Sequence, residues 1–353
     1  MTTLDEQPPV GATGEANRET CIPDICTPNP NCSPWSRATT ADAMRVSDPC
    51  LPDTAPERCP PTQQCMPESN PDPRRSVSAP ARFLWLDLTR KCQNDCRMHC
   101  YNSSGPDGGH GTMTRDDWFS VLDQAVRTGV GRVQLIGGEP TLHPDFAELL
   151  DHALTIGLQV EVFSNLVHIK PEWWNLFGRP GVSLATSYYS ADAAEHNAVT
   201  GRDSHRKTRA NIEKATDLGI PLRAGVIAVR PTQNVEEART DLFTIGVKSV
   251  GTDRVRHFGR GLGDHQPYDV NELCGNCGDG RAAIGPDGTV TPCIMSSWLA
   301  VGNVKSASLA GILAGEEMAR ATATIPKRVA ADPCDPGAEC KPDAHPCYPD
   351  NEG

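Results

Sequence analysis

From residue 81 onward, short apolar runs alternate with amphipathic stretches along the chain. The apolar runs have the length and composition of buried strands, and the amphipathic stretches repeat apolar residues at helical spacing. The predicted strands are 82–88, 131–137, 158–164, 182–188, 222–229 and 249–257. The predicted helices are 115–128, 145–156, 171–177, 205–218 and 234–245. Strands that alternate with helices predict an α/β fold with a parallel sheet.

The first 80 residues follow a different pattern. Six of the 15 cysteines and 15 of the 31 prolines fall in this segment, and aliphatic periodicity is nearly absent. Such a composition predicts irregular chain rather than helices or strands. We therefore expect a Pro/Cys-rich arm over residues 1–80, and the alternative interpretation is a lid or an additional metal-binding arm.

Charge and hydropathy exclude several classes of protein. The net charge of −12 and the pI near 5.3 argue against nucleic acid as a partner. The mean hydropathy is −0.43, and no apolar run approaches the length of about 18 residues that a membrane-spanning helix needs. The N-terminus lacks the basic and apolar regions of a signal peptide, so we expect a cytoplasmic protein. An odd number of cysteines at short spacings favours metal ligation over disulfides.

The most informative stretch is Leu86–Asn102, with the sequence LDLTRKCQNDCRMHCYN. It follows the first predicted strand and contains Cys92, Cys96 and Cys100. Three thiolates can hold an iron–sulfur cluster, and a four-iron cluster with three protein ligands keeps one iron open to an external ligand. A zinc knuckle is the alternative, although zinc sites usually pair Cys-x2-Cys with a distant second pair.

A second motif, Gly137-Gly138-Glu139-Pro140, ends the second predicted strand. The two glycines let the backbone approach a ligand closely, and Glu139 offers an acceptor for an ammonium group. Together, the cysteine triplet and this loop resemble the radical S-adenosylmethionine (SAM) superfamily. The resemblance implies a partial (β/α)6 TIM-like barrel, with its chemistry at the carboxyl ends of the strands. The common spacing of the family is Cys-x3-Cys-x2-Cys, whereas this chain has Cys-x3-Cys-x3-Cys, with one extra residue between the second and third cysteines. His99 also replaces the aromatic residue that usually precedes the third cysteine.

The resemblance also implies cofactor contacts at four strand ends. In the family, the loop that corresponds to Gly137–Pro140 receives the amino group of the methionine moiety of SAM. Ser164 and Asn165 end the third predicted strand, where relatives often contact the carboxylate or ribose of SAM, and a helix cap or turn is the alternative. Ser187 and Arg223, on the fourth and fifth strands, match further cofactor-contacting regions.

The histidines form no paired metal-binding motif. His196 begins a stretch where relatives have His-Asp-x-x-Arg, and in this chain the arginine is displaced to Arg202. The isolated histidines are predicted to be surface, capping or packing residues: His110, His143, His152, His168 and His257.

A second cysteine pattern follows the barrel. Cys274-x2-Cys277 is followed by Gly288 and then by Cys293 after four residues, an arrangement that resembles the start of the auxiliary-cluster domains called SPASM and twitch. Pro286-Asp287-Gly288 predicts a hairpin turn, and a helix is expected at 306–320. A rubredoxin-like or zinc hairpin is the alternative. The resemblance implies at least one auxiliary iron–sulfur cluster, with ligands among Cys274, Cys277, Cys293, Cys334, Cys340 and Cys347.

These patterns predict four segments along the chain. They are an irregular arm at 1–80, a radical SAM partial barrel at 81–262, an auxiliary-cluster domain at 263–325 and a Pro/Cys-rich tail at 326–353.

The resemblance implies an enzyme that cleaves SAM reductively to a 5′-deoxyadenosyl radical, which abstracts hydrogen from a substrate. Its cofactors are SAM, a [4Fe–4S] cluster and at least one auxiliary iron–sulfur cluster. The expected substrate is a ribosomal peptide that is oxidatively crosslinked or otherwise modified. One alternative is a dehydrogenase or dehydratase of a small molecule such as an aminocyclitol or sugar, and another is an iron–sulfur electron carrier or scaffold. Expected partners are ferredoxin or flavodoxin and a separate recognition protein, with no nucleic acid and no membrane.

Overall fold

The computed structural model describes residues 81–263 and 267–327. All of them belong to one compact unit, Ser69–Gly353. The predicted arm at 1–80 and the predicted ligands Cys334, Cys340 and Cys347 lie outside the described residues. No helix within the described ranges is long and apolar enough to cross a membrane.

A nine-stranded sheet forms the centre of this unit, with the order β6-β5-β4-β3-β2-β1-β7-β8-β9. Strands β1 to β6 are paired in parallel with their neighbours. Their bounds are β1 Phe83–Asp87, β2 Arg132–Ile136, β3 Gln159–Phe163, β4 Val182–Tyr188, β5 Leu222–Ala228 and β6 Ser249–Arg254. Six parallel strands in chain order confirm the predicted fold class.

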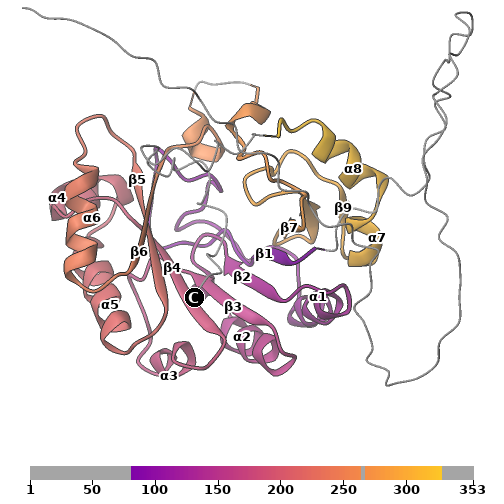
Figure 1. The fold of residues 1–353 in the computed structure, drawn as a ribbon, viewed down its shortest axis with the longest axis horizontal. Coiled ribbons are helices and arrows are strands. Elements are labelled where there is room, and N and C mark those ends of the chain that lie inside the picture. Colours follow the sequence, from indigo (N-terminus) through magenta and orange to yellow (C-terminus); the bar gives the residue numbers. More distant parts are fainter. Residues whose placement is uncertain (1–80, 264–266, 328–353) are drawn as a thin grey trace, which may run out of the picture. The chain divides into compact units, whose positions relative to one another are not determined.

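Helices connect the parallel strands and lie on the outer side of the arc that the strands form (Figure 1). The predicted ones are α1 Arg115–Arg127, α2 Phe146–Thr155, α3 Trp173–Phe177, α5 His205–Asp217 and α6 Val235–Thr244. An additional helix, α4, spans Ala193–Thr200 and was not predicted, because its sequence AAEHNAVT has no continuous apolar stripe. The Asp192 side chain caps its start by accepting a hydrogen bond from the backbone of Glu195, and Gly201 ends it with a φ of 68°.

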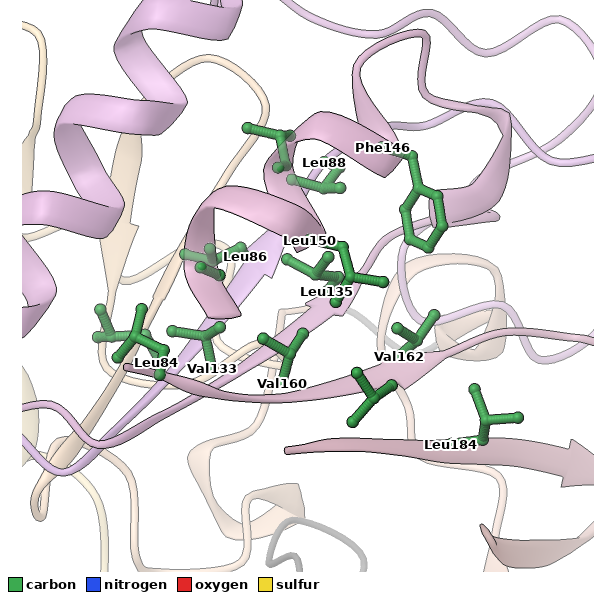
Figure 2. Close-up of a cluster of buried hydrophobic side chains, with 14 of the residues drawn as sticks. Leu84, Leu86, Leu88, Val133, Leu135, Phe146, Leu150, Val160, Val162 and Leu184 are labelled. Atoms are coloured by element: carbon green, nitrogen blue, oxygen red, sulfur yellow. The ribbon is translucent and has the colours of Figure 1, made fainter. Parts of the chain in front are cut away.

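The main core lies between the outer face of the sheet and these helices (Figure 2). It contains buried side chains of β1 to β4 and α2, among them Leu84, Leu86, Val133, Leu135, Phe146, Leu150, Val160, Val162 and Leu184. Complete burial of each such side chain stabilises the fold by about 1.5–3 kcal/mol. The side chains of alternate residues of the same strands lie on the inner face of the sheet instead, for example those of Trp85, Ile136 and Phe163.

The predicted hairpin of the auxiliary segment is present. Strand β7 spans Arg281–Ile284, and β8, Thr289–Thr291, pairs with it antiparallel after a turn in which Gly288 has a φ of 84°. Strand β9, Gly302–Asn303, completes this edge of the sheet. Because β7 also pairs in parallel with β1, the sheet continues across the boundary predicted at residue 262.

The helix predicted at 306–320 is two helices, α7 Leu309–Leu313 and α8 Glu316–Ala323. Gly315 is extended and caps the start of α8. A Cβ atom at Gly315 would lie 2.9 Å from the carbonyl oxygen of Gly311. The backbone between the two helices therefore approaches the backbone of α7 more closely than a side chain at residue 315 would permit.

Candidate functional site

A cavity opens at the carboxyl ends of the parallel strands, with a volume of about 1320 Å³ that includes its opening to solvent. Its walls come from the loops or last residues of β1, β2, β3, β4, β5 and β6. The predicted site residues that line it are Cys92, Cys96, Cys100, Gly137, Gly138, Asn165 and Ser187. The cysteine triplet and the glycine loop therefore face the same space, as expected for neighbouring strand ends of a parallel sheet.

Two sulfur atoms of the cysteine loop have hydrogen-bond donors, one from the loop after β3 and one from the cysteine loop itself. The Asn165 side-chain amide lies 3.6 Å from the Cys92 sulfur, and the backbone N–H of Ser104 lies 3.3 Å from the Cys100 sulfur. In the protein alone, burial and the nearby carboxylate of Glu139 raise the pKa of Cys92 to about 12. The raised pKa favours the protonated thiol, whereas binding to a metal favours the thiolate, because a coordinating thiol loses its proton.

Two observations test whether the cavity fits an iron–sulfur cluster and a polar cofactor. Within the described ranges, no three His, Cys, Asp or Glu side chains converge on a position for a single metal ion. Cys92, Cys96 and Cys100 all line the cavity, and three thiolates that face one cavity can hold a four-iron cluster with one iron left open. In addition, five residues that line the cavity each have a buried polar atom without a hydrogen-bond partner: Asn94, His99, Tyr101, Ser104 and His196. Since buried polar groups are normally paired, this wall fits a ligand with several polar groups.

The glycine loop is held against the cysteine loop by backbone contacts. The N–H of Gly138 donates to the carbonyl of Thr89 at 2.7 Å, and the N–H of Glu139 donates to that of Lys91 at 2.8 Å. A Cβ atom at Gly138 would lie 2.4 Å from the Lys91 oxygen, and one at Gly137, where φ is 145°, would lie 2.6 Å from the Thr89 oxygen. Glycine is thus needed for the two loops to meet.

Glu139 connects the glycine loop to the loop after β3. Its carboxylate, 1% exposed, accepts hydrogen bonds from the backbone and hydroxyl of Thr141, from the hydroxyl of Ser164 and from the backbone N–H of Asn165. Burial raises the pKa of Glu139, and these hydrogen bonds oppose that rise. Glu139, Pro140 and Ser164 are not among the residues that line the cavity, so their predicted contacts with SAM stay predictions.

Arg223 lies nearer the amino ends of the strands than the cavity does. Its guanidinium donates to both carboxylate oxygens of Glu161, at 2.8 and 2.9 Å, and lies over the ring of Phe163. Glu161 also accepts a hydrogen bond from Gln134. Phe163 and Gln134 line the cavity but Arg223 does not, so its predicted contact with the cofactor has no support from its position.

Three aromatic side chains that the sequence did not assign to the site form part of the cavity wall. His99 and the Tyr189 hydroxyl are hydrogen-bonded at 2.9 Å, and the ring of His196 lies 5.4 Å from that of Tyr189. Burial lowers the pKa of His99 to about 4 and that of His196 to about 3, so both rings are neutral near pH 7.

Arg202 is exposed and does not line the cavity.

The auxiliary cysteines Cys274, Cys277 and Cys293 share one apolar cluster with Phe83 and Trp85 of β1. Cys277 and Cys293 are each 1% exposed, and Cys274 is partly buried. The structure therefore brings the three predicted auxiliary ligands together. None of the six cysteines in the described residues forms a disulfide.

A buried ion pair that the sequence did not predict lies between the two cysteine groups. Asp253 and Arg256 are joined at 2.9 Å and are 8% and 5% exposed. With Met295 they line both the large cavity and a small one beside Cys274 and Cys293. Both charged residues lie close to the end of β6, and their spacing in the sequence does not indicate a buried ion pair.

The isolated histidines have the predicted capping and packing contacts. His110 is hydrogen-bonded to Thr89, and a ring nitrogen of His143 accepts a hydrogen bond from the backbone of Asp145. His152 is paired with Asp123, His257 with Glu272, and His168 is exposed.

Comparison with protein families identifies two regions of the chain. Residues 86–245 match the radical SAM superfamily, and residues 265–341 match the SPASM iron–sulfur cluster-binding domain. These ranges include the cysteine triplet with the glycine loop and the auxiliary cysteines, respectively.

Named relatives match about half of the chain. A PqqA peptide cyclase of Streptomyces rochei is 28% identical over 53% of this chain and 51% of its own length. The mycofactocin maturase MftC of Mycobacterium tuberculosis is 30% identical over 53% of this chain and 48% of its own. The chain therefore spans about half the length of these relatives.

Among solved structures, Streptococcus suis SuiB bound to its precursor peptide SuiA aligns with a TM-score of 0.57 and 15% identity. The alignment covers 67% of this chain and 65% of SuiB, and at this identity it shows a shared fold. The family matches imply SAM, a [4Fe–4S] cluster and an auxiliary iron–sulfur cluster as cofactors. The chain belongs to the radical SAM superfamily and combines its partial barrel with a SPASM iron–sulfur cluster-binding domain.

Proposed function

We propose that the chain is a radical SAM enzyme that modifies a peptide, with an oxidative crosslink as the leading candidate for the modification. The observation that carries this proposal is the cavity that Cys92, Cys96, Cys100 and the loop at Gly137–Gly138 share. The peptide substrate is supported by relatives named as a peptide cyclase and a maturase and by the SuiB complex with its precursor peptide.

In this proposal, the thiolates of Cys92, Cys96 and Cys100 hold a [4Fe–4S] cluster. Asn165 and Ser104 donate hydrogen bonds to the sulfur atoms, which tunes the reduction potential of such a cluster. Together, the cluster and SAM supply a carbon radical that can remove hydrogen from an unactivated carbon, which no acid–base side chain can do. The protein has to position the substrate and exclude water.

The cavity wall suits this task. The loop at Gly137 and Gly138 presents its backbone to the cavity without side chains, which lets SAM approach it closely. Trp85, Ile136 and Phe163 form an apolar part of the wall, which limits the water near the reacting carbon. His99 and His196 are neutral near pH 7 and offer polar ring nitrogens without adding charge.

The auxiliary cysteines support a second cluster on the other side of the Asp253–Arg256 pair. We propose Cys274, Cys277 and Cys293 as ligands, completed by one of the tail cysteines Cys334, Cys340 and Cys347. Such a cluster would accept the electron that the product radical gives up when it is oxidised to the final product. The proposal further includes a cytoplasmic location, ferredoxin or flavodoxin as electron donor and a separate recognition protein for the peptide.

The test is SAM cleavage by the anaerobically reconstituted full chain. After addition of dithionite and SAM, we expect 5′-deoxyadenosine from the native protein and none from Cys96→Ala. A matched control, Met98→Ala, changes a residue of the same loop that is 44% exposed and should retain the activity. Absence of 5′-deoxyadenosine from native protein that carries its iron and sulfide would refute the proposed function and support an electron carrier or scaffold.

The substrate class is tested separately. A short peptide encoded beside the gene, incubated with the active protein, should lose two hydrogens if a crosslink forms, as measured by mass spectrometry. If the peptide is unchanged and an aminocyclitol or sugar is modified, the substrate is a small molecule and the proposed peptide substrate is wrong.

A further inference from the structure

A short helical turn after β6, Gly259–Leu262, contacts the loop that contains the first three cysteines. The Arg260 guanidinium donates hydrogen bonds to the carbonyls of Cys96 at 3.1 Å, Ser103 at 3.3 Å and Ser104 at 2.6 Å. The backbone N–H of Arg260 also donates to the carbonyl of Cys100, at 2.9 Å. One residue thus contacts both ends of the segment from Cys96 to Ser104.

The close approach of the two segments depends on glycine on both sides. Gly259 has a φ of 51°, and a Cβ atom there would lie 2.3 Å from the carbonyl oxygen of Tyr101. A Cβ atom at Gly105 would lie 2.9 Å from the guanidinium of Arg260. The turn therefore fits against the cysteine loop at the level of the backbone.

The cysteine loop needs donors from outside itself for its backbone carbonyls. Its extra residue lengthens the segment between the second and third cysteines, and its carbonyls lie outside any helix or strand. Backbone carbonyls that leave regular structure need other donors. Arg260 can serve several at once, because a guanidinium has five N–H groups in a rigid planar fork, whereas a lysine ammonium is a single flexible point of charge.

We propose that Arg260 is a positioning residue that holds the three-cysteine loop in the conformation required to bind its cluster. Arg260 does not line the cavity, so it acts through the loop rather than on a substrate. The inference rests on the proposed function, because it takes Cys92, Cys96 and Cys100 as the cluster ligands. It adds a residue outside the cysteine motif, in the turn that leads from the barrel to the auxiliary segment.

The test compares Arg260→Gln and Arg260→Lys with Arg97→Gln in the reconstituted full chain. Arg97 belongs to the same loop and pairs with Asp95 at 2.8 Å, but its side chain is 82% exposed and donates to no loop carbonyl among the bonds described. The readouts are the rate of iron loss to a chelator and the EPR spectrum of the reduced protein with and without SAM. Only the cluster with an open iron should change its spectrum when SAM binds.

Replacing residues that orient metal ligands typically weakens metal binding by about 10- to 100-fold. We therefore expect Arg260→Gln to lose the SAM-responsive signal faster than native protein by about this factor. Arg260→Lys should be intermediate and Arg97→Gln should match the native protein. Equal rates for Arg260→Gln and native protein would overturn the inference, as would equal losses for Arg260→Gln and Arg97→Gln. Native protein that carries iron without any SAM-responsive signal would refute the proposed function itself.

Discussion

The replacement Glu139→Gln tests whether this carboxylate joins two loops or binds the cofactor directly. One carboxylate oxygen accepts from the backbone N–H of Thr141 at 3.2 Å, and the other accepts from the backbone N–H of Asn165 at 2.8 Å. A glutamine of the same shape has only one side-chain oxygen. In either orientation its NH2 group therefore faces one of these two N–H donors, and that donor loses its partner.

The expected cost follows from these contacts. An unsatisfied buried donor costs about 1–3 kcal/mol, and the remaining hydrogen bonds also weaken when the acceptor loses its charge. We expect the variant to be destabilised by about 2–4 kcal/mol in total. For a domain of this size, this corresponds to a fall in melting temperature of about 5–10 °C.

Two measurements on anaerobically purified protein distinguish the alternatives. The first is thermal unfolding without SAM, with Glu148→Gln as control, because Glu148 is 59% exposed and its ion pair with Arg115 should contribute less than about 1 kcal/mol. The second is the affinity for SAM. Stability equal to that of the control, together with a tenfold or greater loss of SAM affinity, would show that Glu139 contacts the cofactor and would refute the role derived from its hydrogen bonds.

Two further variants probe the site. Gly138→Ala should lose the SAM-responsive EPR signal, because its Cβ would lie 2.4 Å from the Lys91 oxygen. The control Gly131→Ala has open space around the new Cβ and should retain the signal. A normal signal from Gly138→Ala would contradict the steric argument. The pKa of His196 is about 3 in the folded chain against 6.5 normally, so the unfolded chain gains a proton first as pH falls and stability decreases between pH 6.5 and 3. At pH 5 His196 accounts for a loss of about 2 kcal/mol, and His99, whose pKa is also lowered, adds its own share. His196→Phe should therefore reduce the loss seen in melting curves recorded between pH 7.5 and 5 without abolishing it. An unchanged pH dependence would rule out a contribution from His196.

The sequence was sufficient to predict the residues that lie directly after strands. Cys92 and Gly137 follow β1 and β2, and neighbouring parallel strands end at the same edge of a sheet, so their convergence follows from the order of the elements. Arg260 could not be found in this way, because its contacts depend on how the chain after β6 approaches a loop far away in sequence, and periodicity carries no information about this. The Asp253–Arg256 pair is local, but its burial depends on the packing around the end of β6, which the spacing of the two residues does not show.

Local chemistry also limited what the sequence could show. A glutamate in a glycine-rich loop suits both a cofactor contact and an internal hydrogen-bond acceptor, and the sequence does not show that Thr141, Ser164 and Asn165 donate to it. Helix α4 lacks an apolar stripe, so the pattern that predicted the other helices was missing. The break at Gly315 is visible as a residue type, but isolated glycines also occur within helices.

The pairing of β7 with β1 affects how independent the two parts of the chain can be. Without the segment after residue 262, β1 would become an edge strand with an unpaired row of N–H and C=O groups. Cys277 and Cys293 would no longer cover Phe83 and Trp85 of that strand. An exposed apolar edge promotes association between copies of a protein. The auxiliary segment is therefore no detachable module, and a shortened barrel is expected to aggregate rather than to persist as a simpler enzyme.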